Sequence, residues 1–554
     1  MTVYRKFNIL WVCIILVGIV AQSVIADEPC NLREFEHGFV CVCNITHCDY
    51  LDEDVDNPKE GEVLIITSNE DGLRFDVQKY PLIKNSSDTI TLRNYPIEPE
   101  VILVRGSQWS SAVNWFTRSS KVNIDVDLSR TYQKILGFGG AFTGSVAHNL
   151  DQMNDQMQEA LYKMYYSKMG IGYNFMRIPI GGCDFDLEPW AYNEFPRDDA
   201  NLSNFTTLDP RDLKLLEKIK QLKEVSNNSD IKILASAWSP PPWMKTNNQW
   251  TGASALKKEY YQTWAEYHVR FIELMAEKGI DLWGITTGNE PMNGVIGWLF
   301  VHFMSLGWSA SNQGIWVADH LAPTLKKSTA NKVKVLAGDD QRYTFPWWFR
   351  DMNSKRPNAT DQLYGFAVHW YWDKFFPPEL LDTTHDEYPD KVILNTESCI
   401  GDKPLQTHGP VLGSWTRAED YILAYIEDFK HFVNGWIDWN LLLDENGGPN
   451  YVSNHVDAPV IVNKSSNEAY KQPLFYAIGH FSRFIPENSV RIELTIHDNN
   501  IDGVAFSRPD KKIVLVLYNK SKSTFYATLN MKQQPSVTFT IPPKTIHTVI
   551  FSEP

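Results

Sequence analysis

The chain has 554 residues, enough for one large core and a satellite domain. Hydrophobic residues make up 43% and charged residues 21%, which excludes an intrinsically disordered protein. The formal net charge of −15 argues against a nucleic-acid-binding surface, because such a surface needs clustered Lys and Arg.

Residues 1–26 predict a secretory signal peptide. Arg5 and Lys6 precede an apolar stretch over 9–20, and the small residue Ala26 supplies a cleavage site. No later stretch approaches the roughly 20 apolar residues that a membrane-spanning helix needs. We therefore expect the chain to enter the secretory pathway. We expect the mature chain to have no transmembrane segment.

Four cysteines crowd into the segment after the signal peptide. They are Cys30, Cys41, Cys43 and Cys48. Their spacing leaves three disulfide pairings open, and a zinc cluster is the alternative. An oxidising compartment favours disulfides. Cys13 is removed with the signal peptide, and Cys183 and Cys399 are predicted to be free thiols.

Eight Asn-x-Ser/Thr sequons are spread along the chain. They begin at Asn44, Asn85, Asn201, Asn204, Asn227, Asn358, Asn463 and Asn519. Each alone is common by chance, but the set is typical of a glycoprotein. With the signal peptide and the cysteines, the sequons predict a secreted or lysosomal protein.

The hydrophobic pattern changes along the chain and divides it into predicted regions. Period-two alternation, clearest over 122–128, predicts strands up to about residue 130, and the C-terminal part alternates in the same way. We expect both β-rich ends to meet in one sandwich beside a central domain. The regions are a disulfide-bearing β segment at 27–55, the first part of the sandwich at 56–130, a central barrel at 131–441, a β segment at 442–485 that pairs with the N-terminal region, and the second part of the sandwich at 486–554.

Short apolar segments alternate with helical stretches in the central region. Eight segments predict strands: 135–142, 174–181, 231–238, 282–288, 333–338, 365–371, 392–398 and 435–440. Asp209 and Pro210 supply a helix N-cap and first turn, and Leu213, Leu216 and Ile219 follow at helical spacing. This alternation predicts an α/β fold with a (β/α)8 TIM barrel rather than an open sheet.

Polar side chains gather at the carboxyl ends of the predicted strands, where the active site of such a barrel lies. Glu290, next to Asn289, follows the fourth strand, and Glu397 ends the seventh. The other side chains near strand ends are Arg177, Asp184, Trp238, His369, Tyr371 and Trp439. Two carboxylates facing a Trp-rich pocket indicate glycoside hydrolysis, in which one acid donates a proton and the other attacks or activates water. A retaining mechanism predicts a separation of about 5 Å between them.

These residues also have structural interpretations. Arg177 could pair with a buried carboxylate, and His369 could be a hydrogen-bonded core histidine. Trp238 and Trp439 could cap the barrel core, and Asp184 could hold a loop. The Asn-Glu pair alone could be a helix cap or a solvated loop end.

Two other enzyme classes are excluded by spacing. The glycine run at 137–140 lacks the G-x-G-x-x-G spacing of a nucleotide-binding loop, so we expect it to serve tight packing of the first strand. No G-x-S-x-G elbow is present, which argues against a serine hydrolase of that type.

A series of motifs in a fixed order carries a family resemblance. Among them are "CVCNITHC", "GFGGAFT", "PPWMKTN", "AGDDQR", "VHWYWD", "NTESC" and "GWIDWNLLLDENGGPN". With these motifs the chain resembles, nearly end to end, the glucosylceramidase-type family of retaining glycoside hydrolases, family 30. The resemblance implies hydrolysis of glucosylceramide to glucose and ceramide by double displacement, with Glu397 as nucleophile and Glu290 as acid/base.

The resemblance also implies roles for the residues around the two glutamates. Asn289 would hydrogen-bond the sugar 2-hydroxyl, and Arg177 would orient Glu397 and keep it ionised. His369 and Tyr371 would line the same wall. The residues that would bind the glucose hydroxyls and ring face are Asp184, Trp238, Trp439 and Asn454.

Further expectations follow from the same resemblance. It implies the disulfides Cys30–Cys41 and Cys43–Cys48, and an immunoglobulin-like sandwich. It also implies a glycosphingolipid substrate at a membrane surface, a saposin-type activator and the lysosomal lumen, with secretion as the alternative. No metal or organic cofactor is implied.

Two segments, 292–312 and 400–411, depart from the family pattern, and an insertion follows Cys48. Both segments are expected at the entrance for the aglycone; 297–304 is unusually apolar, which suits a lipid tail, a membrane contact or buried packing equally. The alternatives are therefore another retaining β-glycosidase, such as a β-glucosidase on soluble glycosides, a xylanase or a galactosidase, and a non-catalytic glycan- or lipid-binding protein.

Overall fold

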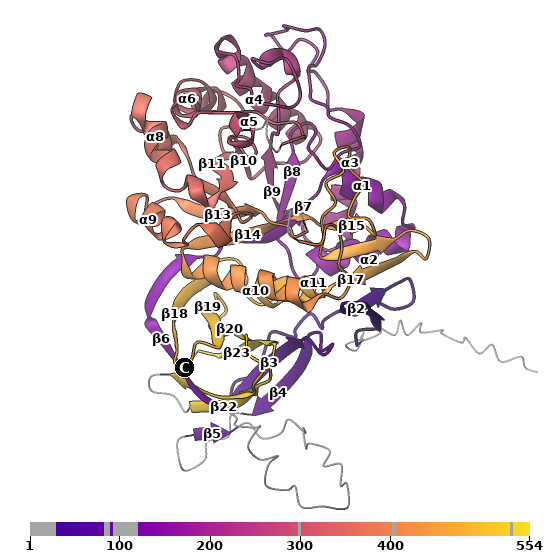
Figure 1. Cartoon of the computed structure of the whole chain (residues 1–554), viewed down its shortest axis with the longest axis vertical. Helices are drawn as coiled ribbons and strands as arrows, with labels where there is room; N and C mark the ends of the chain where they lie inside the picture. Colours follow the sequence, from indigo (N-terminus) through magenta and orange to yellow (C-terminus); the bar gives the residue numbers. More distant parts are fainter. Residues whose placement is uncertain are drawn as a thin grey trace, which may run out of the picture.

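The computed structural model describes residues 29–81, 89–91, 120–296, 301–401, 406–531 and 536–553. The predicted signal peptide and the sequon at Asn85 lie outside these residues. The described parts form a closed barrel, a ten-stranded sheet and a five-stranded sheet. Figure 1 shows the barrel at the top, the large sheet below it and the small sheet beside their junction. Among the described helices, none is long and apolar enough to cross a membrane.

Eight parallel strands close the barrel in chain order, which confirms the predicted (β/α)8 fold. They are β7 (Gly137–Ala141), β8 (Phe175–Pro179), β9 (Lys232–Ser236), β10 (Gly284–Thr286), β11 (Lys334–Gln341), β12 (Gly365–His369), β13 (Val392–Glu397) and β14 (Val433–Asn440). The ring closes where Gly435 of β14 pairs with Gly137 of β7. A Cβ on Gly139 would lie 2.3 Å from the backbone oxygen of Phe175, so the glycine run does serve tight packing.

The helices between the strands pack around the barrel. They are α1 (Gly144–Asp151), α2 (Asp155–Tyr166), α3 (Pro210–Val225), α4 (Tyr261–Glu277), α5 (Asn293–Ile296), α6 (Ala310–Trp316), α7 (Ala322–Lys327), α8 (Trp347–Lys355), α9 (Glu379–Glu387), α10 (Trp415–Lys430) and α11 (Pro473–Ser482). The predicted start of α3 is confirmed, because the Asp209 side chain accepts a hydrogen bond from the Arg211 amide. Leu216 and Ile219 of this helix are buried.

The two β-rich ends of the chain meet in the ten-stranded sheet, which forms the sandwich. Its strands are β3 (Glu62–Asn69), β4 (Asp76–Pro81), β5 (Thr89–Thr91), β6 (Ser120–Lys134), β18 (Val490–Ile496), β19 (Ile501–Ser507), β20 (Lys512–Asn519), β21 (Phe525–Met531), β22 (Ser536–Ile541) and β23 (Thr545–Ser552). β6 lies between β18 and β21, and its alternating Val122, Ile124 and Val126 point into the sandwich core.

β20 connects the sandwich to the barrel. Its residues Ile513 and Leu515 belong to the sandwich core, whereas Val514 and Val516 belong to the core shared with the barrel helices. Both faces are thus buried, which explains why this strand is a continuous apolar run rather than an alternating one. The helices α10 and α11 lie at this junction (Figure 1).

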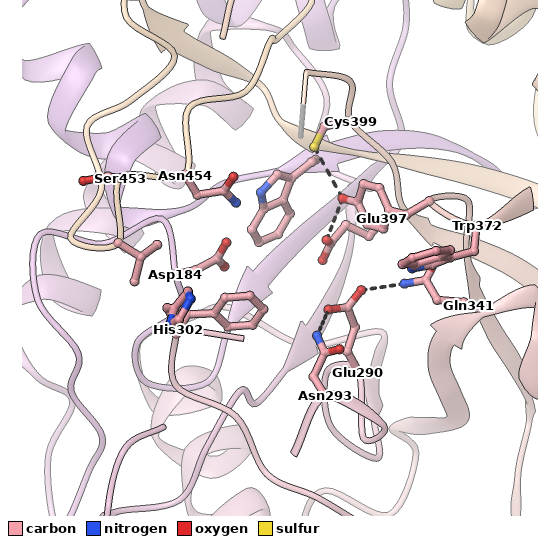
Figure 2. A pocket seen from close by; sticks show the side chains of 14 residues that line it. Asp184, Glu290, Asn293, His302, Gln341, Trp372, Glu397, Cys399, Ser453 and Asn454 are labelled. Atoms are coloured by element: carbon pink, nitrogen blue, oxygen red, sulfur yellow. Dashed lines mark hydrogen bonds between the residues drawn. The ribbon is translucent and has the colours of Figure 1, made fainter. Parts of the chain in front are cut away.

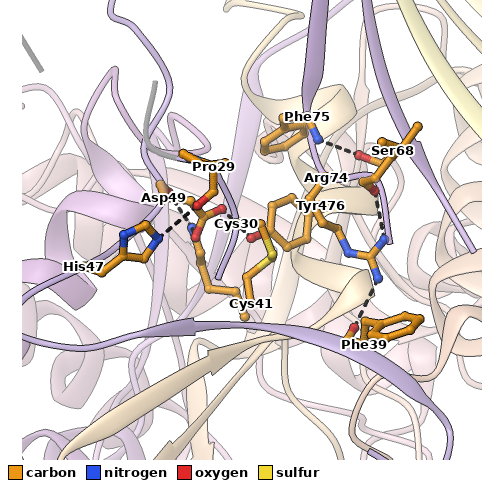
Figure 3. Close-up of a disulfide and its surroundings, with 12 residues drawn as sticks. Pro29, Cys30, Phe39, Cys41, His47, Asp49, Ser68, Arg74, Phe75 and Tyr476 are labelled. Atoms are coloured by element: carbon orange, nitrogen blue, oxygen red, sulfur yellow. Dashed lines mark hydrogen bonds and ion pairs between the residues drawn. A yellow bond between two sulfur atoms is a disulfide. The ribbon is translucent and has the colours of Figure 1, made fainter. Parts of the chain in front are cut away.

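The small sheet carries both disulfides. It consists of β1 (Leu32–Phe35), β2 (Gly38–Cys43), β15 (Leu442–Asp444), β16 (Val460–Asn463) and β17 (Glu468–Lys471), in the order β1-β2-β17-β16-β15. The bonds are Cys30–Cys41 and Cys43–Cys48, the pairing that the resemblance implies, so the zinc alternative is wrong. Figure 3 shows the first of them next to the buried side chains of Arg74 and Tyr476. Cys183 and Cys399 are buried and form no disulfide bond within the described residues.

One predicted glycosylation site is contradicted. The Asn519 side chain is fully buried, and its amide nitrogen donates to the carbonyl oxygens of Ser523, Ile541 and Pro542. A nitrogen engaged in this way inside the sandwich cannot carry a glycan in the folded protein.

Candidate active site

The two glutamates reach the rim of the barrel by different routes. Glu397 is the last residue of β13, whereas Glu290 lies beyond the end of β10 in the left-handed backbone region, with φ +43°. The Glu290 amide donates to the Asp339 carbonyl at 2.8 Å, and the Asn289 amide donates to the Ala237 carbonyl at 2.9 Å. These bonds to the fifth barrel strand and to the residue that follows the third hold the left-handed backbone of Glu290. In a residue other than glycine, this conformation costs about 1 to 3 kcal/mol.

The two carboxyl groups lie next to each other in a cavity of about 390 Å³ (Figure 2). An oxygen of one lies within 4.8 Å of an oxygen of the other. The described residues that line the cavity are Asp184, Glu290, Asn293, His302, Phe303, Gln341, Tyr371, Trp372, Glu397, Cys399, Trp439, Val452, Ser453 and Asn454. This upper bound on one pair of oxygens is compatible with the predicted separation of about 5 Å between the carboxyl groups.

Glu397 is held by two donors. Arg177 Nη1 donates to Oε2 of Glu397, and the Tyr371 hydroxyl donates to Oε1 at 2.8 Å. Burial raises the pKa of Glu397, and the charges of His369 and Arg177 oppose this shift. Because a guanidinium and a hydroxyl both donate to this carboxyl group, its surroundings suit the ionised form.

Glu290 is held by a different set of donors. Gln341 Nε2 donates to Oε1 of Glu290 at 2.7 Å, and His369 Nδ1 lies 3.1 Å from the same oxygen. Asn293 Nδ2 donates to the other oxygen, Oε2. The two oxygens of this carboxyl group therefore have different surroundings.

His369 connects Glu290 to a buried aspartate. Its Nε2 lies 3.1 Å from Asp339 Oδ1, and its Nδ1 faces Glu290. Burial alone lowers the pKa of His369, but the charge of Glu397 and the hydrogen bonds to Asp339 and Glu290 outweigh it and raise the pKa to about 10. The imidazole is thus a cation at neutral pH, and both ring nitrogens carry protons.

Asp339 is the centre of this network, and the sequence-based prediction missed it. Its carboxylate is fully buried and accepts hydrogen bonds from Arg177 Nη2 at 3.0 Å and from three hydroxyl groups. The hydroxyl groups belong to Ser236, Thr286 and Thr396. Burial raises the pKa of Asp339, but the charge of Arg177 and the bond to His369 outweigh burial and hold it well below its ordinary range. The sequence feature that could have identified Asp339 is its position in the motif "AGDDQR", at the end of the fifth strand. No site residue was predicted at that strand end.

The predicted substrate-binding residues fall into two groups. Asp184, Tyr371, Trp439 and Asn454 line the cavity. The others, which lie behind its lining, are Arg177, Trp238, Asn289 and His369. Burial, and then the charges of Glu397 and Glu290, raise the pKa of Asp184 well above its ordinary value.

Trp238 and Trp439 show why the two groups differ. Their rings stack at 5.4 Å, and only Trp439 reaches the cavity. The Arg177 guanidinium lies 4.9 Å from the Trp238 ring. Trp238 thus supports Trp439 and Arg177 from behind.

Asn289 lies behind the lining and contacts Arg177. Its Oδ1 accepts from Arg177 Nη2 at 2.8 Å. No hydrogen bond from its Nδ2 to another of the described residues is found.

Further residues of the cavity were not predicted. Gln341 and Asn293 contact Glu290, and His302, Phe303 and Trp372 also line the cavity. Gln341 follows Asp339 at the end of the fifth strand, where a strand but no site residue was predicted. Asn293, His302 and Phe303 lie in the segment 292–312, whose departure from the family pattern was the only sequence signal.

A TIM barrel with two adjacent carboxyl groups in a sugar-sized cavity defines the chain as a glycoside hydrolase. The chain belongs to glycosyl hydrolase family 30. Residues 135–485 match the TIM-barrel domain of that family, and residues 488–549 match its β-sandwich domain.

Relatives match along nearly the whole chain. A putative glucosylceramidase 3 of Caenorhabditis elegans is 35% identical over 544 residues, which is 95% of this chain and 96% of the relative. The lysosomal acid glucosylceramidase of Mus musculus is 34% identical over 532 residues, with the same coverage. The crystal structure of SrfJ from Salmonella typhimurium, at 23% identity, superposes with a TM-score of 0.75 over 89% of this chain and 100% of that chain, and it shows the fold alone.

Proposed function

We propose that this chain is a retaining β-glucosidase that hydrolyses glucosylceramide to glucose and ceramide. The observation that carries the proposal is the pair of carboxyl groups, Glu290 and Glu397, with oxygens within 4.8 Å of each other. Retaining enzymes hold the two groups about 5 to 5.5 Å apart, whereas inverting enzymes leave room for a water molecule between them. The substrate is inferred from the relatives that bear the name glucosylceramidase.

In the first step, the Glu397 carboxylate attacks the anomeric carbon of the glucosyl group. Glu290 donates its proton to the glycosidic oxygen, the bond to ceramide breaks, and a glucosyl ester forms on Glu397. In the second step, Glu290 removes a proton from water, the water oxygen attacks the anomeric carbon, and the ester bond breaks. Glucose leaves, Glu397 is again a carboxylate and Glu290 is again protonated.

The surroundings of the two glutamates support this assignment of roles. Glu397 receives hydrogen bonds from Arg177 and Tyr371, which stabilise the anion needed for attack. Glu290 has Gln341 and His369 at Oε1, whereas its Oε2 contacts the neutral amide of Asn293, which can adapt to either protonation state.

The polar side of the cavity suits a glucose ring. Asp184 and Asn454 offer groups that bind hydroxyls, and Trp439 offers an aromatic ring that can contact an apolar sugar face. The Nδ2 of Asn289 would bind the 2-hydroxyl, a contact that strengthens in the transition state.

Exposed apolar side chains on the segments that follow three barrel strands suit a lipid aglycone at a membrane surface. They are Val295, Ile296, Trp347, Trp372 and Phe375, each more than 40% exposed, on the segments after β10, β11 and β12. A saposin-type activator and the lysosomal lumen, or secretion, belong to the same proposal.

The decisive experiment is hydrolysis of glucosylceramide in mixed micelles near pH 5 by the wild type and by Glu397→Gln. We expect glucose from the wild type and a loss of at least about 1,000-fold in the variant, because the amide cannot form the covalent intermediate. A soluble aryl β-glucoside is assayed in parallel. Cleavage of that glucoside without cleavage of the lipid, also after addition of a saposin, would contradict the lipid substrate and favour a β-glucosidase on soluble glycosides. An active Glu397→Gln variant would contradict the role of the nucleophile.

A further inference from the structure

Asn293 is the first residue of α5, and its side chain points at Glu290 in the cavity (Figure 2). Its Nδ2 donates to Oε2 of Glu290. Among the described residues it makes the one hydrogen bond to this oxygen. The Asn293 side chain therefore lies next to the oxygen from which Glu290 could donate a proton to the glycosidic bond.

The two oxygens of Glu290 differ in which of them can carry a proton. Oε1 already receives the amide of Gln341 at 2.7 Å and the ring of His369 at 3.1 Å. His369 is a cation whose second nitrogen faces Asp339, so its Nδ1 donates. Because two donors occupy Oε1, a proton on Glu290 belongs on Oε2, the oxygen that Asn293 contacts.

The backbone around Asn293 is held at several points. Its amide donates to the Glu290 carbonyl at 2.9 Å, and the Met292 amide donates to Asp340 Oδ2 at 2.9 Å. The next residue, Gly294, accepts from the Ser254 amide at 2.8 Å. A Cβ on Gly294 would lie 1.9 Å from the backbone nitrogen of Gly307, so this contact requires glycine. The Asn293 side chain therefore extends from a fixed position.

We propose that Asn293 is a positioning residue for the acid/base Glu290, an inference that rests on the proposed function. While Glu290 is ionised, the amide nitrogen of Asn293 donates to Oε2. While Glu290 is protonated, the amide is turned by half a rotation, and its oxygen accepts the proton of Oε2 and directs it toward the glycosidic oxygen. The proton passes from Oε2 to the leaving oxygen and is replaced from water in the second step. The other titratable groups that face Glu290 are His369, Asp340, Glu397, Asp184 and Tyr343.

The test compares Asn293→Leu, which keeps the shape and removes the amide, with the wild type on two β-glucosides. An alkyl glucoside needs protonation of its leaving oxygen, whereas a 2,4-dinitrophenyl glucoside does not. We expect kcat/KM of Asn293→Leu to fall about 5- to 10-fold on the alkyl glucoside and less than about 2-fold on the dinitrophenyl glucoside, the effect of one lost hydrogen bond. The ratio of the two kcat/KM values is independent of how much of the enzyme is folded.

A pH profile supplies the second readout. Asn293→Asp places a second carboxyl group beside Oε2, and the repulsion between the two carboxylates should move the alkaline limb of kcat/KM on the alkyl glucoside to higher pH. The matched control is Asn312→Leu, on α6 outside the cavity lining, whose amide bonds Lys355 instead.

The outcomes separate this inference from the function on which it rests. A wild type that cleaves neither glucoside would contradict the proposed function. A wild type that cleaves both, with an unchanged substrate ratio in Asn293→Leu and an unchanged alkaline limb in Asn293→Asp, would overturn the positioning role alone. A loss of equal size on both substrates would also overturn it, because that result indicates a role in binding or folding.

Discussion

At the scale of single residues, the site depends on one buried charge that has no place in the chemical steps. Asp339 contacts neither carboxyl group of the catalytic pair, yet it bonds Arg177, which orients Glu397, and His369, which orients Glu290. One anion thereby sets the positions of both partners. The positive charges of Arg177 and His369 are in turn stable in the barrel because Asp339 is ionised there.

Asp339→Asn keeps the shape of the side chain and removes its charge. We expect the free energy of unfolding to fall by about 3 kcal/mol, because Arg177 loses a buried ion-pair partner. We also expect kcat on a soluble β-glucoside to fall more than about 100-fold, because His369 loses the charge that keeps it protonated and oriented. Urea denaturation and steady-state kinetics measure the two effects.

Asp361→Asn, at an exposed position before β12, is the control and should change neither quantity. Wild-type stability and kcat in Asp339→Asn would show that the network does not depend on this charge.

At the scale of elements, α3 carries a buried acid that links stability to pH. Asp212, in the first turn of the helix, accepts a hydrogen bond from the Tyr192 hydroxyl. Burial, partly offset by that bond, raises the pKa of Asp212 from its ordinary value of 3.8 to about 8. The folded state therefore keeps a proton on Asp212 that the unfolded chain has released at neutral pH.

Because the pKa of Asp212 is higher in the folded state than in the unfolded chain, raising the pH destabilises the folded state. We predict that the free energy of unfolding of the wild type, relative to Asp212→Asn, falls as the pH rises from about 4 to about 8. The slope is at most about 1.4 kcal/mol per pH unit, since one proton is involved. Below pH 4 the aspartic acid is neutral in both states, and the difference between the two proteins should level off. Urea denaturation of both proteins at pH 4, 6 and 8 measures the difference. A difference that is constant over this range would contradict the raised pKa.

At the scale of the whole molecule, the barrel presents its cavity and the exposed apolar loops on the same rim. Phe375, after β12, is 72% exposed and does not line the cavity. We expect Phe375→Ser to lower glucosylceramide hydrolysis on vesicles about 5- to 10-fold, because a phenyl group that could be buried in lipid is lost. Hydrolysis of a soluble β-glucoside should stay the same.

The control for Phe375→Ser is Tyr526→Ser, a 43% exposed aromatic residue on β21 of the sandwich. Equal losses on vesicles for both variants, or an equal loss on the soluble glucoside, would contradict a lipid-facing rim.

The sequence by itself determined the eight barrel strands, the start of α3 and the meeting of both β-rich ends in the sandwich. These features depend on local periodicity and on capping residues such as Asp209, which neighbouring residues in the chain are enough to set. The rule that strand ends form the active site then placed Glu290 and Glu397 together, because the fold fixes where the ends of parallel strands meet.

Only the tertiary structure decided which of these side chains line the cavity and which hold other side chains in position. Asp339 gathers Arg177 and His369, which lie far from it in the chain, and Trp238 lies behind Trp439 rather than in the cavity. The sequon at Asn519 predicted an exposed side chain, but this side chain is buried in the sandwich. Burial and hydrogen-bond partners are set by packing between distant segments, and no local pattern of residues specifies which segments these will be.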